Sequence, residues 1–447
     1  MNNEIETYLI ELMNQKLLTS DDIASYKDLF VKFLPSVVNY IDPELITLYS
    51  SPSNGIETDP NIGYAQFPQD PRFGDVHFYD YKNDPLDPSN YPLSKFTSEF
   101  GVQSYPSVIS WNQSLSLNSS GREDFWDPFG TLVEHRQHQP NGMQYLKEQL
   151  SFSFGEVPAD SDYQKIMYLT QLNQALYLRS NIERLKSFQC KLIGNNYPQK
   201  SRDLRSNLIG EGLNSGYMFW QFNDVWSAPT WSIMDSAGIL KMAYYTMRES
   251  NKAKILAVED QSLNIITIAY MPGDTDIENM DFSVSCYRFE DYQKIKTLHG
   301  SFNLTREIFN GFTHPSKNCP IRFIELSHNE MSNLCGCNVN EGVFDCYVKV
   351  KVSKNCDEKL ILLNRPKRMR GLISGQNIVI VNIEEVPVGG DAKSFKIKLK
   401  SVEKEHFYVW LSLENAILSY EFDENAFHLG KEASRDVKLI IYGKLMN

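Results

Sequence analysis

The sequence lacks any apolar run long enough to cross a membrane. Spanning a bilayer takes roughly 20 consecutive apolar residues, and no stretch of the 447 residues approaches that length without a charge. The first twenty positions are no exception, because Glu4, Glu6, Glu11 and Lys16 interrupt their apolar pattern. We therefore expect no signal peptide in this chain and no membrane partner.

An excess of basic residues is also lacking. The chain has 44 Lys and Arg against 56 Asp and Glu, which gives a formal net charge of −12 and a pI near 5.3. Domains that bind nucleic acid usually present a basic face, so we expect no nucleic-acid partner. The sequence has neither a phosphate-cradling glycine loop nor a Gly-x-Ser-x-Gly serine elbow.

Cysteine is scarce in the first two thirds of the chain. Only Cys190 occurs before the group at positions 286, 319, 335, 337, 346 and 356. We expect a disulfide of an extracellular or lysosomal protein within the cluster of cysteines that runs from Cys335 to Cys356, with its pairing left open. Zinc fits poorly, because the two cysteines of Cys335-Gly336-Cys337 are too close together and no histidine pair follows. Glycosylation sequons beginning at Asn112, Asn118 and Asn303 favour the secretory route.

The pattern up to residue 250 alternates helices and strands. Apolar spacing predicts a helix over 5–17 and a second one from Ser20 to Val38. Short strands are predicted over 45–49 and 75–79, and a third is predicted to end at Glu99. A long helix is predicted over 161–188 and a buried strand over 216–222. This alternation is typical of a parallel α/β arrangement, either a barrel or an open sheet.

From about residue 251 the pattern changes to short strands separated by Asn, Asp, Gly and Pro, which predicts antiparallel sandwiches. The predicted strands are Leu263–Ala269, Phe282–Tyr287, Gly342–Val352, Asn377–Ile383, Phe395–Leu399, Phe407–Leu413 and Val437–Tyr442. A basic linker, Pro366–Arg370, predicts a boundary near 370. We therefore expect three parts, 1–250, 251–370 and 371–447, within the two to four domains that this length allows.

Two acidic residues, Glu99 and Glu4, are candidates for catalytic carboxylates. Glu99 ends a β-prone run, and a single aromatic residue separates it from Gly101. Glu4 follows two asparagines. The aromatic segment Trp220–Trp226 offers a surface for sugar. Two carboxylates with aromatic residues suggest sugar hydrolysis, because retaining glycosidases use one carboxylate to attack the anomeric carbon and another to protonate the departing oxygen.

Five motifs occur in the order seen in the β-mannosidases of glycoside hydrolase family 2, and the chain resembles the animal lysosomal enzymes most. The motifs are Asn2-Asn3-Glu4, Gly74–Tyr79, Ser98–Ser104, His135–His138 and Tyr217–Pro229. The resemblance covers nearly all of this chain but only the C-terminal half of the family's usual length. We therefore expect that the first half of the protein is missing here.

The resemblance implies a fold. It implies an incomplete (β/α)8 TIM barrel, about strands 4–8, in which Glu4 ends the fourth strand and Glu99 the seventh. The first three strands and most of the fourth would lie upstream of Met1. Two immunoglobulin-like β-sandwich domains would follow and buttress the barrel. The expected fold class is thus multidomain, α/β plus all-β.

The resemblance also implies roles for the two glutamates. Glu99 is expected to be the nucleophile, and the alternative is a surface glutamate at the start of a loop. Glu4 is expected to be the acid/base, whose pKa must be raised, and the alternative is the start of a solvent-exposed helix. Asn3 is expected to hydrogen-bond the 2-hydroxyl of the sugar.

Four more residues are predicted to bind substrate. Trp220 and Asn223 are expected to form the floor of the mannose site, although an aromatic strand is as often simply core. His77 and Tyr79 alternate with apolar neighbours, so one pair is expected to face the pocket. Tyr79 is a candidate donor to an ionised Glu99, and a buried structural hydroxyl is the alternative.

Supporting residues complete the sequence interpretation. Asp224 and Trp226 are expected to support the site rather than to bind the sugar. The His135–His138 run suggests a zinc site at first sight, but no third ligand matches it. We expect no metal there, and the resemblance places this run at the rim of the site, near the leaving group.

The predicted function is that of a retaining exo-β-mannosidase that removes terminal non-reducing β-D-mannose from oligosaccharides and glycoproteins in the lysosome. The mechanism would be double displacement and would need no cofactor. As a truncated chain the protein is expected to be inactive, because an incomplete barrel leaves strand edges unpaired. The alternative is a catalytically dead protein, derived from a glycosidase, that binds sugar or serves as a scaffold. The sequence leaves the oligomeric state open.

Overall fold

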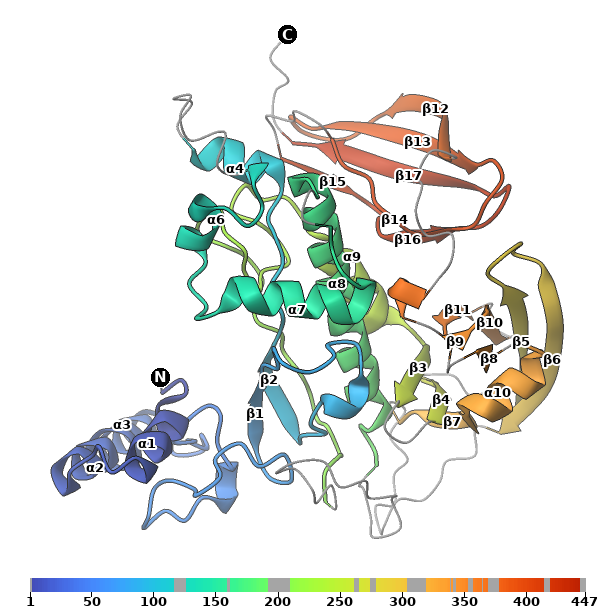
Figure 1. The fold of residues 1–447 in the computed structure, drawn as a ribbon. Helices are drawn as coiled ribbons and strands as arrows, with labels where there is room; N and C mark the ends of the chain where they lie inside the picture. Colours follow the sequence, from blue (N-terminus) through green and yellow to red (C-terminus); the bar gives the residue numbers. More distant parts are fainter. Residues whose placement is uncertain are drawn as a thin grey trace.

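The computed structural model shows a mixed architecture of helices and sheets, several of the sheets antiparallel (Figure 1). It describes residues 2–115, 126–158, 161–191, 210–260, 265–273, 279–303, 319–337, 339–340, 343–352, 357–363, 365–368, 378–413 and 419–442. The boundary predicted near 370, Cys356, the Asn118 sequon and most of the Asn303 sequon lie outside these residues. None of the helices in the described residues is long and apolar enough to span a membrane.

The chain begins with helices gathered at one end of the molecule (Figure 1). They are α1 (Ile5–Asn14), α2 (Ser20–Tyr26), the π-helical η1 (Lys27–Phe33) and α3 (Leu34–Ile41). Thr19 starts α2 through a capping box with Asp22, in which each side chain bonds the other's backbone N–H. The helices predicted over 5–17 and 20–38 are therefore confirmed.

The strand predicted over 45–49 is wrong. These residues form no strand, and Leu45, Ile46 and Leu48 are exposed. A β-prone run needs a partner strand and a surface to pack on, and here neither is at hand. Pairing begins only at Ser51, which forms an isolated parallel bridge with Asn3.

A short parallel sheet follows. β1 (Asp75–Phe78) and β2 (Phe96–Phe100) pair in parallel, which confirms the strands predicted over 75–79 and up to Glu99, although β2 runs one residue further. The strand predicted over 216–222 is not a regular one. The segment runs beside β2, with a parallel bridge from Tyr217 to Thr97 and a bond from the N–H of Trp220 to the carbonyl of Phe100. At Gln221 the chain turns to bond Trp231 instead, which ends the ladder.

Helices pack around this sheet. The long helix α8 (Tyr163–Ser187), predicted over 161–188, runs through the middle of the molecule and packs against α9 (Met242–Lys252) (Figure 1). Side chains of both helices and of β1 and β2 share one apolar core. The described residues of this part also form α4 (Val108–Ser114), α6 (Thr131–Arg136), α7 (Gly142–Phe154), η2 (Gly55–Glu57) and η3 (Pro88–Asn90).

The next part is built of antiparallel sheets. The order β3-β4-β7 joins Ile255–Asp260, Ile265–Tyr270 and Ile321–Ser327, and the order β11-β10-β5-β6 joins Asp357–Leu362, Cys346–Val352, Asn279–Arg288 and Lys294–Asn303. One apolar core contains residues of both sheets and of α10 (His328–Cys335), so the two sheets face each other. A small hairpin pairs β8 (Val339–Asn340) with β9 (Val343–Phe344), and η4 covers Pro366–Arg368.

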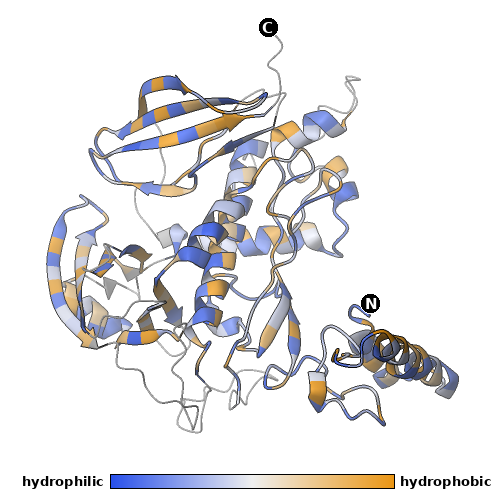
Figure 2. Cartoon of the chain, turned by 180° about the vertical axis from the view of Figure 1, so that it is seen from behind, coloured by the Kyte–Doolittle hydropathy of each residue, from blue (hydrophilic) through white to orange (hydrophobic). Residues whose placement is uncertain are grey.

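The last sheets lie above the long helix (Figure 1). The order β12-β13-β17-β15 joins Ile378–Val386, Lys393–Ser401, Ser434–Ile441 and Tyr420–Phe422, and β14 (His406–Val409) pairs with β16 (Phe427–Leu429). Buried and exposed residues alternate along β13, and Figure 2 shows the matching bands of apolar and polar residues. The core of this part includes Ile109, Ile239 and Tyr245 from the helical part, so the two parts pack together.

Three disulfides link the described cysteines. They are Cys190–Cys319, Cys286–Cys335 and Cys337–Cys346. The disulfide predicted within the cluster from Cys335 to Cys356 is present as Cys337–Cys346. The other two bridges could not be predicted, because spacing alone does not fix connectivity.

Candidate active site

The parallel pair β1 and β2 brings polar and aromatic side chains together. His77 on β1 lies opposite Glu99 on β2, and Tyr79 follows β1 directly. The hydroxyl of Tyr79 donates a hydrogen bond of 2.8 Å to Oε2 of Glu99. Nδ1 of the buried His77 lies 3.6 Å from the same oxygen. Residues two apart along a strand share a face, which is why His77 and Tyr79 both reach Glu99.

Glu4 reaches the same place from the start of α1. Its backbone has a φ of 61°, in the left-handed region, and its N–H donates to the carbonyl of Ser51 at 2.7 Å. A non-glycine residue held there costs of order 1–3 kcal/mol, and such residues cluster at functional sites. Its Oε1 lies 2.9 Å from Nδ1 of His77.

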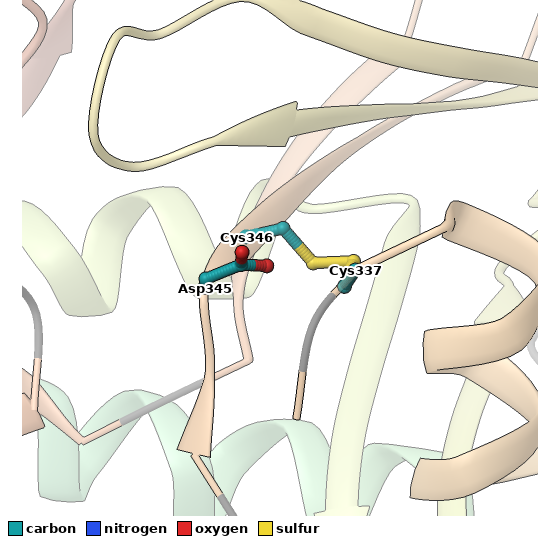
Figure 3. A group of neighbouring side chains, drawn as sticks. All are labelled: Cys337, Asp345 and Cys346. Atoms are coloured by element: carbon teal, nitrogen blue, oxygen red, sulfur yellow. A yellow bond between two sulfur atoms is a disulfide. The ribbon is translucent and has the colours of Figure 1, made fainter. Parts of the chain in front are cut away.

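The two glutamates converge on His77. One carboxylate oxygen of Glu4, one of Glu99 and a ring nitrogen of His77 all lie within 4.8 Å of one another. Three such atoms could also hold a divalent cation. A second group with similar spacing, Cys337, Asp345 and Cys346, offers no thiolates because its two cysteines form a disulfide (Figure 3).

The surroundings shift the pKa values of the two carboxyl groups in opposite directions. The hydrogen bond with His77 lowers the pKa of Glu4 below its ordinary value of 4.5, and partial burial works against this effect. Burial raises the pKa of Glu99 above 4.5, although the Tyr79 hydrogen bond opposes it. The raised pKa expected at Glu4 is therefore wrong in direction, and the ionised state expected of Glu99 stays a prediction. The cause at Glu4 is its contact with His77, and the cause at Glu99 is burial, since the Glu99 side chain is only 14% exposed.

A group of small polar residues lies behind His77. Nε2 of His77 is 3.1 Å from Oγ of Ser51, and that hydroxyl donates a 2.7 Å bond to Asp75. Asp75 also accepts from the hydroxyl and the N–H of Ser98, at 2.6 and 2.9 Å. The sequence analysis missed Ser51 and Asp75. The alternation of Asp75, His77 and Tyr79 along one strand was the signal that could have found Asp75.

Gly101 allows a close approach behind Glu99. A Cβ atom at this position would lie 2.3 Å from the carbonyl oxygen of Trp220 and 3.2 Å from Cδ1 of Trp231. Gly101 is not among the residues with positive φ. A glycine is needed here because the segment that carries Trp220 packs directly on the end of β2.

The other predicted binding residues lie at the edges of this group. Asn3 precedes Glu4, and its side chain is exposed. Trp220 is 42% exposed, and Asn223 is exposed in the turn that follows it. The structure thus brings Glu4, His77, Glu99 and Tyr79 together, each in contact with the next, and it places Asn3, Trp220 and Asn223 on neighbouring segments.

Asp224 and Trp226 hold the loop after Trp220. The buried carboxylate of Asp224 accepts bonds from the hydroxyls of Thr230 and Ser232, at 2.7 and 2.5 Å. The guanidinium of Arg136 lies over the Trp226 ring, and His138 meets the same ring edge-on. The His135–His138 run therefore packs on this loop through Arg136 and His138.

A group of aromatic side chains, Tyr81, Tyr145 and Trp231, lies next to Tyr79, and the sequence analysis missed these residues. Tyr81 lies parallel to Tyr145 of α7, with ring centroids 5.2 Å apart, and its hydroxyl accepts a 3.0 Å bond from Nε1 of Trp231. Trp231 meets the ring of Tyr79 edge-on. Tyr81 repeats the two-residue spacing of His77 and Tyr79, which was the available signal. Such rings are partners for the C–H faces of sugars.

Comparisons with known proteins point to one class. No family model matches the chain. The β-mannosidase of Capra hircus is 32% identical over 259 residues, which are 56% of this chain and 27% of the goat protein. The β-mannosidase of Mus musculus is 25% identical over 414 residues, which are 91% of this chain and 42% of the mouse protein. The chain thus spans less than half of the length of these relatives.

Two solved structures share the fold. A β-D-mannosidase from Dictyoglomus thermophilum superimposes with a TM-score of 0.61 at 16% identity, over 92% of this chain and 42% of that one. An exo-chitosanase from Amycolatopsis orientalis gives 0.54 at 12% identity, over 82% of this chain and 42% of that one. At such identities the likeness is one of fold.

The matches make this chain a relative of the glycoside hydrolases. Within that class its curated relatives are β-mannosidases, those of animals among them, so the resemblance predicted from the five motifs is confirmed.

Proposed function

We propose that the chain carries the two catalytic carboxylates of a retaining exo-β-mannosidase. Its substrate is a terminal non-reducing β-D-mannose residue of an oligosaccharide or glycoprotein, and its mechanism is double displacement without a cofactor. The observation that carries the proposal is the approach of Glu4 and Glu99, whose carboxylate oxygens lie within 4.8 Å. Retaining enzymes hold their two carboxyl groups about 5–5.5 Å apart, and inverting enzymes about 6.5–9.5 Å.

The roles follow from the contacts. Glu99 attacks the anomeric carbon, and the Tyr79 hydroxyl fixes its orientation through the bond to Oε2. Glu4 protonates the departing oxygen and later takes a proton from water. Asn3, Trp220 and Asn223 bind the sugar from the neighbouring segments, together with His77 and Tyr79.

The proposal includes a fold for the catalytic part. Residues 1–250 correspond to about strands 4–8 of a (β/α)8 barrel, and 251–370 and 371–447 to two immunoglobulin-like sandwiches. Support comes from the parallel contacts of Asn3 with Ser51, β1 with β2 and Thr97 with Tyr217, in chain order. The facing sheets of the second part and the apolar core over the sheets of the third support the sandwiches. A lysosomal location fits the three disulfides, since these persist in oxidising compartments.

A second candidate function is sugar binding without catalysis. It is favoured by the half-exposed carboxylate of Glu4 and its lowered pKa, because a general acid has to carry its proton at the working pH. On the same ground we expect the 447-residue chain by itself to turn over β-mannosides slowly or not at all. The test of function therefore has to detect a single covalent event.

Covalent labelling provides that test. 2-Deoxy-2-fluoro-β-D-mannosyl fluoride reacts with the nucleophile of a retaining enzyme, and its C2 fluorine slows release. We expect one adduct per chain on the peptide that contains Glu99, found by mass spectrometry after digestion, and none with the galactose-configured analogue. If calorimetry shows mannose binding but no adduct forms, the sugar-binding alternative replaces the proposal.

The labelling rate is expected to depend on pH through Glu99. Only the ionised carboxylate attacks, and burial raises the pKa of Glu99 above 4.5. The rate should therefore rise with pH through a midpoint above 4.5. Tyr79→Phe is the matched control, because it removes a hydrogen bond that lowers this pKa and should move the midpoint higher still. A midpoint below 4.5 in the parent protein contradicts this account.

A further inference from the structure

The carboxylate of Asp75 organises the hydroxyl groups behind the site. It accepts hydrogen bonds from Oγ of Ser51 at 2.7 Å, from Oγ of Ser98 at 2.6 Å and from the N–H of Ser98 at 2.9 Å. A carboxylate is an acceptor only, so both hydroxyls direct their protons toward it. Ser51 and Asp75 touch neither of the proposed catalytic glutamates in these bonds.

The position of the Ser51 proton decides which nitrogen of His77 is protonated. A hydroxyl has one proton, and that of Ser51 points at Asp75. Ser51 Oγ can then only accept from Nε2 of His77, 3.1 Å away. Nε2 therefore carries a proton, because it has to be the donor in a bond whose other partner can only accept.

The other ring nitrogen then shares a proton with Glu4. Nδ1 lies 2.9 Å from Oε1 of Glu4, and a bond at this distance needs one proton between the two atoms. The pair is either imidazolium with carboxylate or neutral imidazole with carboxylic acid. Among the described residues, the other charged or titratable groups near the pair include Glu99, Asp75 and the hydroxyls of Tyr79 and Tyr81.

We propose that Asp75 is a positioning residue that, through Ser51, keeps a proton on Nε2 of His77 and so maintains a transferable proton between His77 and Glu4. The inference rests on the proposed function. During the first step the bond from Glu99 to the anomeric carbon forms and the bond to the departing oxygen breaks. The shared proton moves through Glu4 to that oxygen and leaves His77 neutral with Nε2 protonated. In the second step the oxygen of a water molecule bonds to the anomeric carbon as the bond to Glu99 breaks, and the proton that this water loses restores the pair.

This arrangement explains how a half-exposed glutamate with a lowered pKa serves as the acid. The proton resides in the contact between Glu4 and His77 rather than on Glu4 alone. Without the Asp75 acceptor, Ser51 is free to donate to Nε2, and the ring then takes the tautomer with its proton on Nδ1. That ring is a neutral donor to a bare carboxylate, and the pair holds one proton fewer.

The tautomer of His77 is measurable without any turnover. The full chain, labelled with ¹⁵N in its histidine rings, is observed by NMR at neutral pH, and His77→Gln assigns the signal. In the parent protein we expect a protonated Nε2. In Asp75→Asn the new amide can donate to Ser51, and we expect the proton to leave Nε2 for Nδ1. Asp80→Asn is the control, because its carboxylate bonds the N–H groups of Lys82 and Asn83 instead.

A second variant tests the same link in case Asp75→Asn does not fold. Ser51→Ala removes the hydroxyl that links Asp75 to His77 and leaves the Asp75–Ser98 bonds in place, so it too should reduce protonation at Nε2. A protonated Nε2 that is unchanged in both variants overturns the proposal, and so does a parent protein with its proton on Nδ1 alone. Because protonation of Nε2 is measured without hydrolysis, the experiment distinguishes failure of the proposed role of Asp75 from failure of the proposed function.

Where turnover is measurable, the leaving group provides a further readout. Asp75→Asn should slow cleavage of a β-linked mannose disaccharide by about 10-fold or more, since its alkoxide departs only with a proton. Reaction with the fluoride reagent should stay nearly unchanged, because fluoride needs little acid assistance. Equal losses with both substrates would show a merely structural effect of Asp75.

Discussion

Glu99→Gln is expected to stop covalent labelling by the fluorinated mannoside, with a rate loss of at least about 10⁴-fold. The amide has nearly the shape of the carboxylate and can still accept the Tyr79 hydrogen bond, but it is not a nucleophile. Mass spectrometry of the intact chain over a time course measures the loss. Glu4→Gln is the comparison, and it should retain most of the labelling because the fluoride leaves without an acid.

The same substitution should not unfold the protein. Burial raises the pKa of Glu99 in the folded state above its ordinary value of 4.5. A carboxyl group shifted upward favours folding while it is protonated, and that contribution is lost as the pH rises through the raised value. At neutral pH the ionised Glu99 therefore costs stability, and a neutral glutamine should leave the melting temperature equal or higher. Labelling of Glu99→Gln at the parental rate would remove Glu99 from the nucleophile's role.

Local patterns in the sequence predict the elements around the site well. The helix predicted over 161–188 is α8 (Tyr163–Ser187), and the strands predicted near 75–79 and up to Glu99 are β1 and β2. These elements carry strong periodicity and lie in a shared core, where pattern and environment agree. The same patterns put His77 and Glu99 on strands, which the structure shows to be paired, and the roles of Glu4 and Glu99 in catalysis stay predictions.

The wrong predictions have a common physical cause. The structure of these segments depends on residues that are distant in the sequence. The run over 45–49 is β-prone, but nothing pairs with it. The segment at 216–222 loses its ladder where Gln221 turns to Trp231. The pKa direction of Glu4 depends on the hydrogen bond with His77 and that of Glu99 on burial, and no local residue pattern reports either.

The role of Ser51 in the polar group behind His77 could not be predicted from the sequence either. Ser51 is a small residue in a loop, and its importance comes from Asp75, which is 24 positions away and accepts its proton. Nothing in the local sequence distinguishes this serine from its neighbours at positions 50 and 53. Side chains that act through a second residue are found by geometry, because their effect depends on where a proton lies.

Loss of the Cys190–Cys319 bridge should be the most destabilising change away from the site. The bridge joins the chain just after α8 to the chain just before β7, across a sequence separation of 129 residues. Closing a loop of that length restricts the unfolded chain and contributes about 5 kcal/mol of stability. Beside it, the guanidinium of Arg322 lies 4.6 Å from the ring centre of Phe188, so the joined segments are also in contact when folded. We expect the double variant Cys190→Ala, Cys319→Ala to unfold at distinctly lower urea concentration.

The short bridge Cys337–Cys346 provides the matched control. Its separation is only 9 residues, for which the same chain-entropy argument gives about 2.5 kcal/mol. Replacing both of its cysteines by alanine should therefore cost about half as much. The order of the two losses tests the argument, since native-state contacts of the sulfur atoms would make them similar. If the short bridge proves as important as the long one, packing around Cys346 holds this part together, and the link from α8 to β7 is secondary.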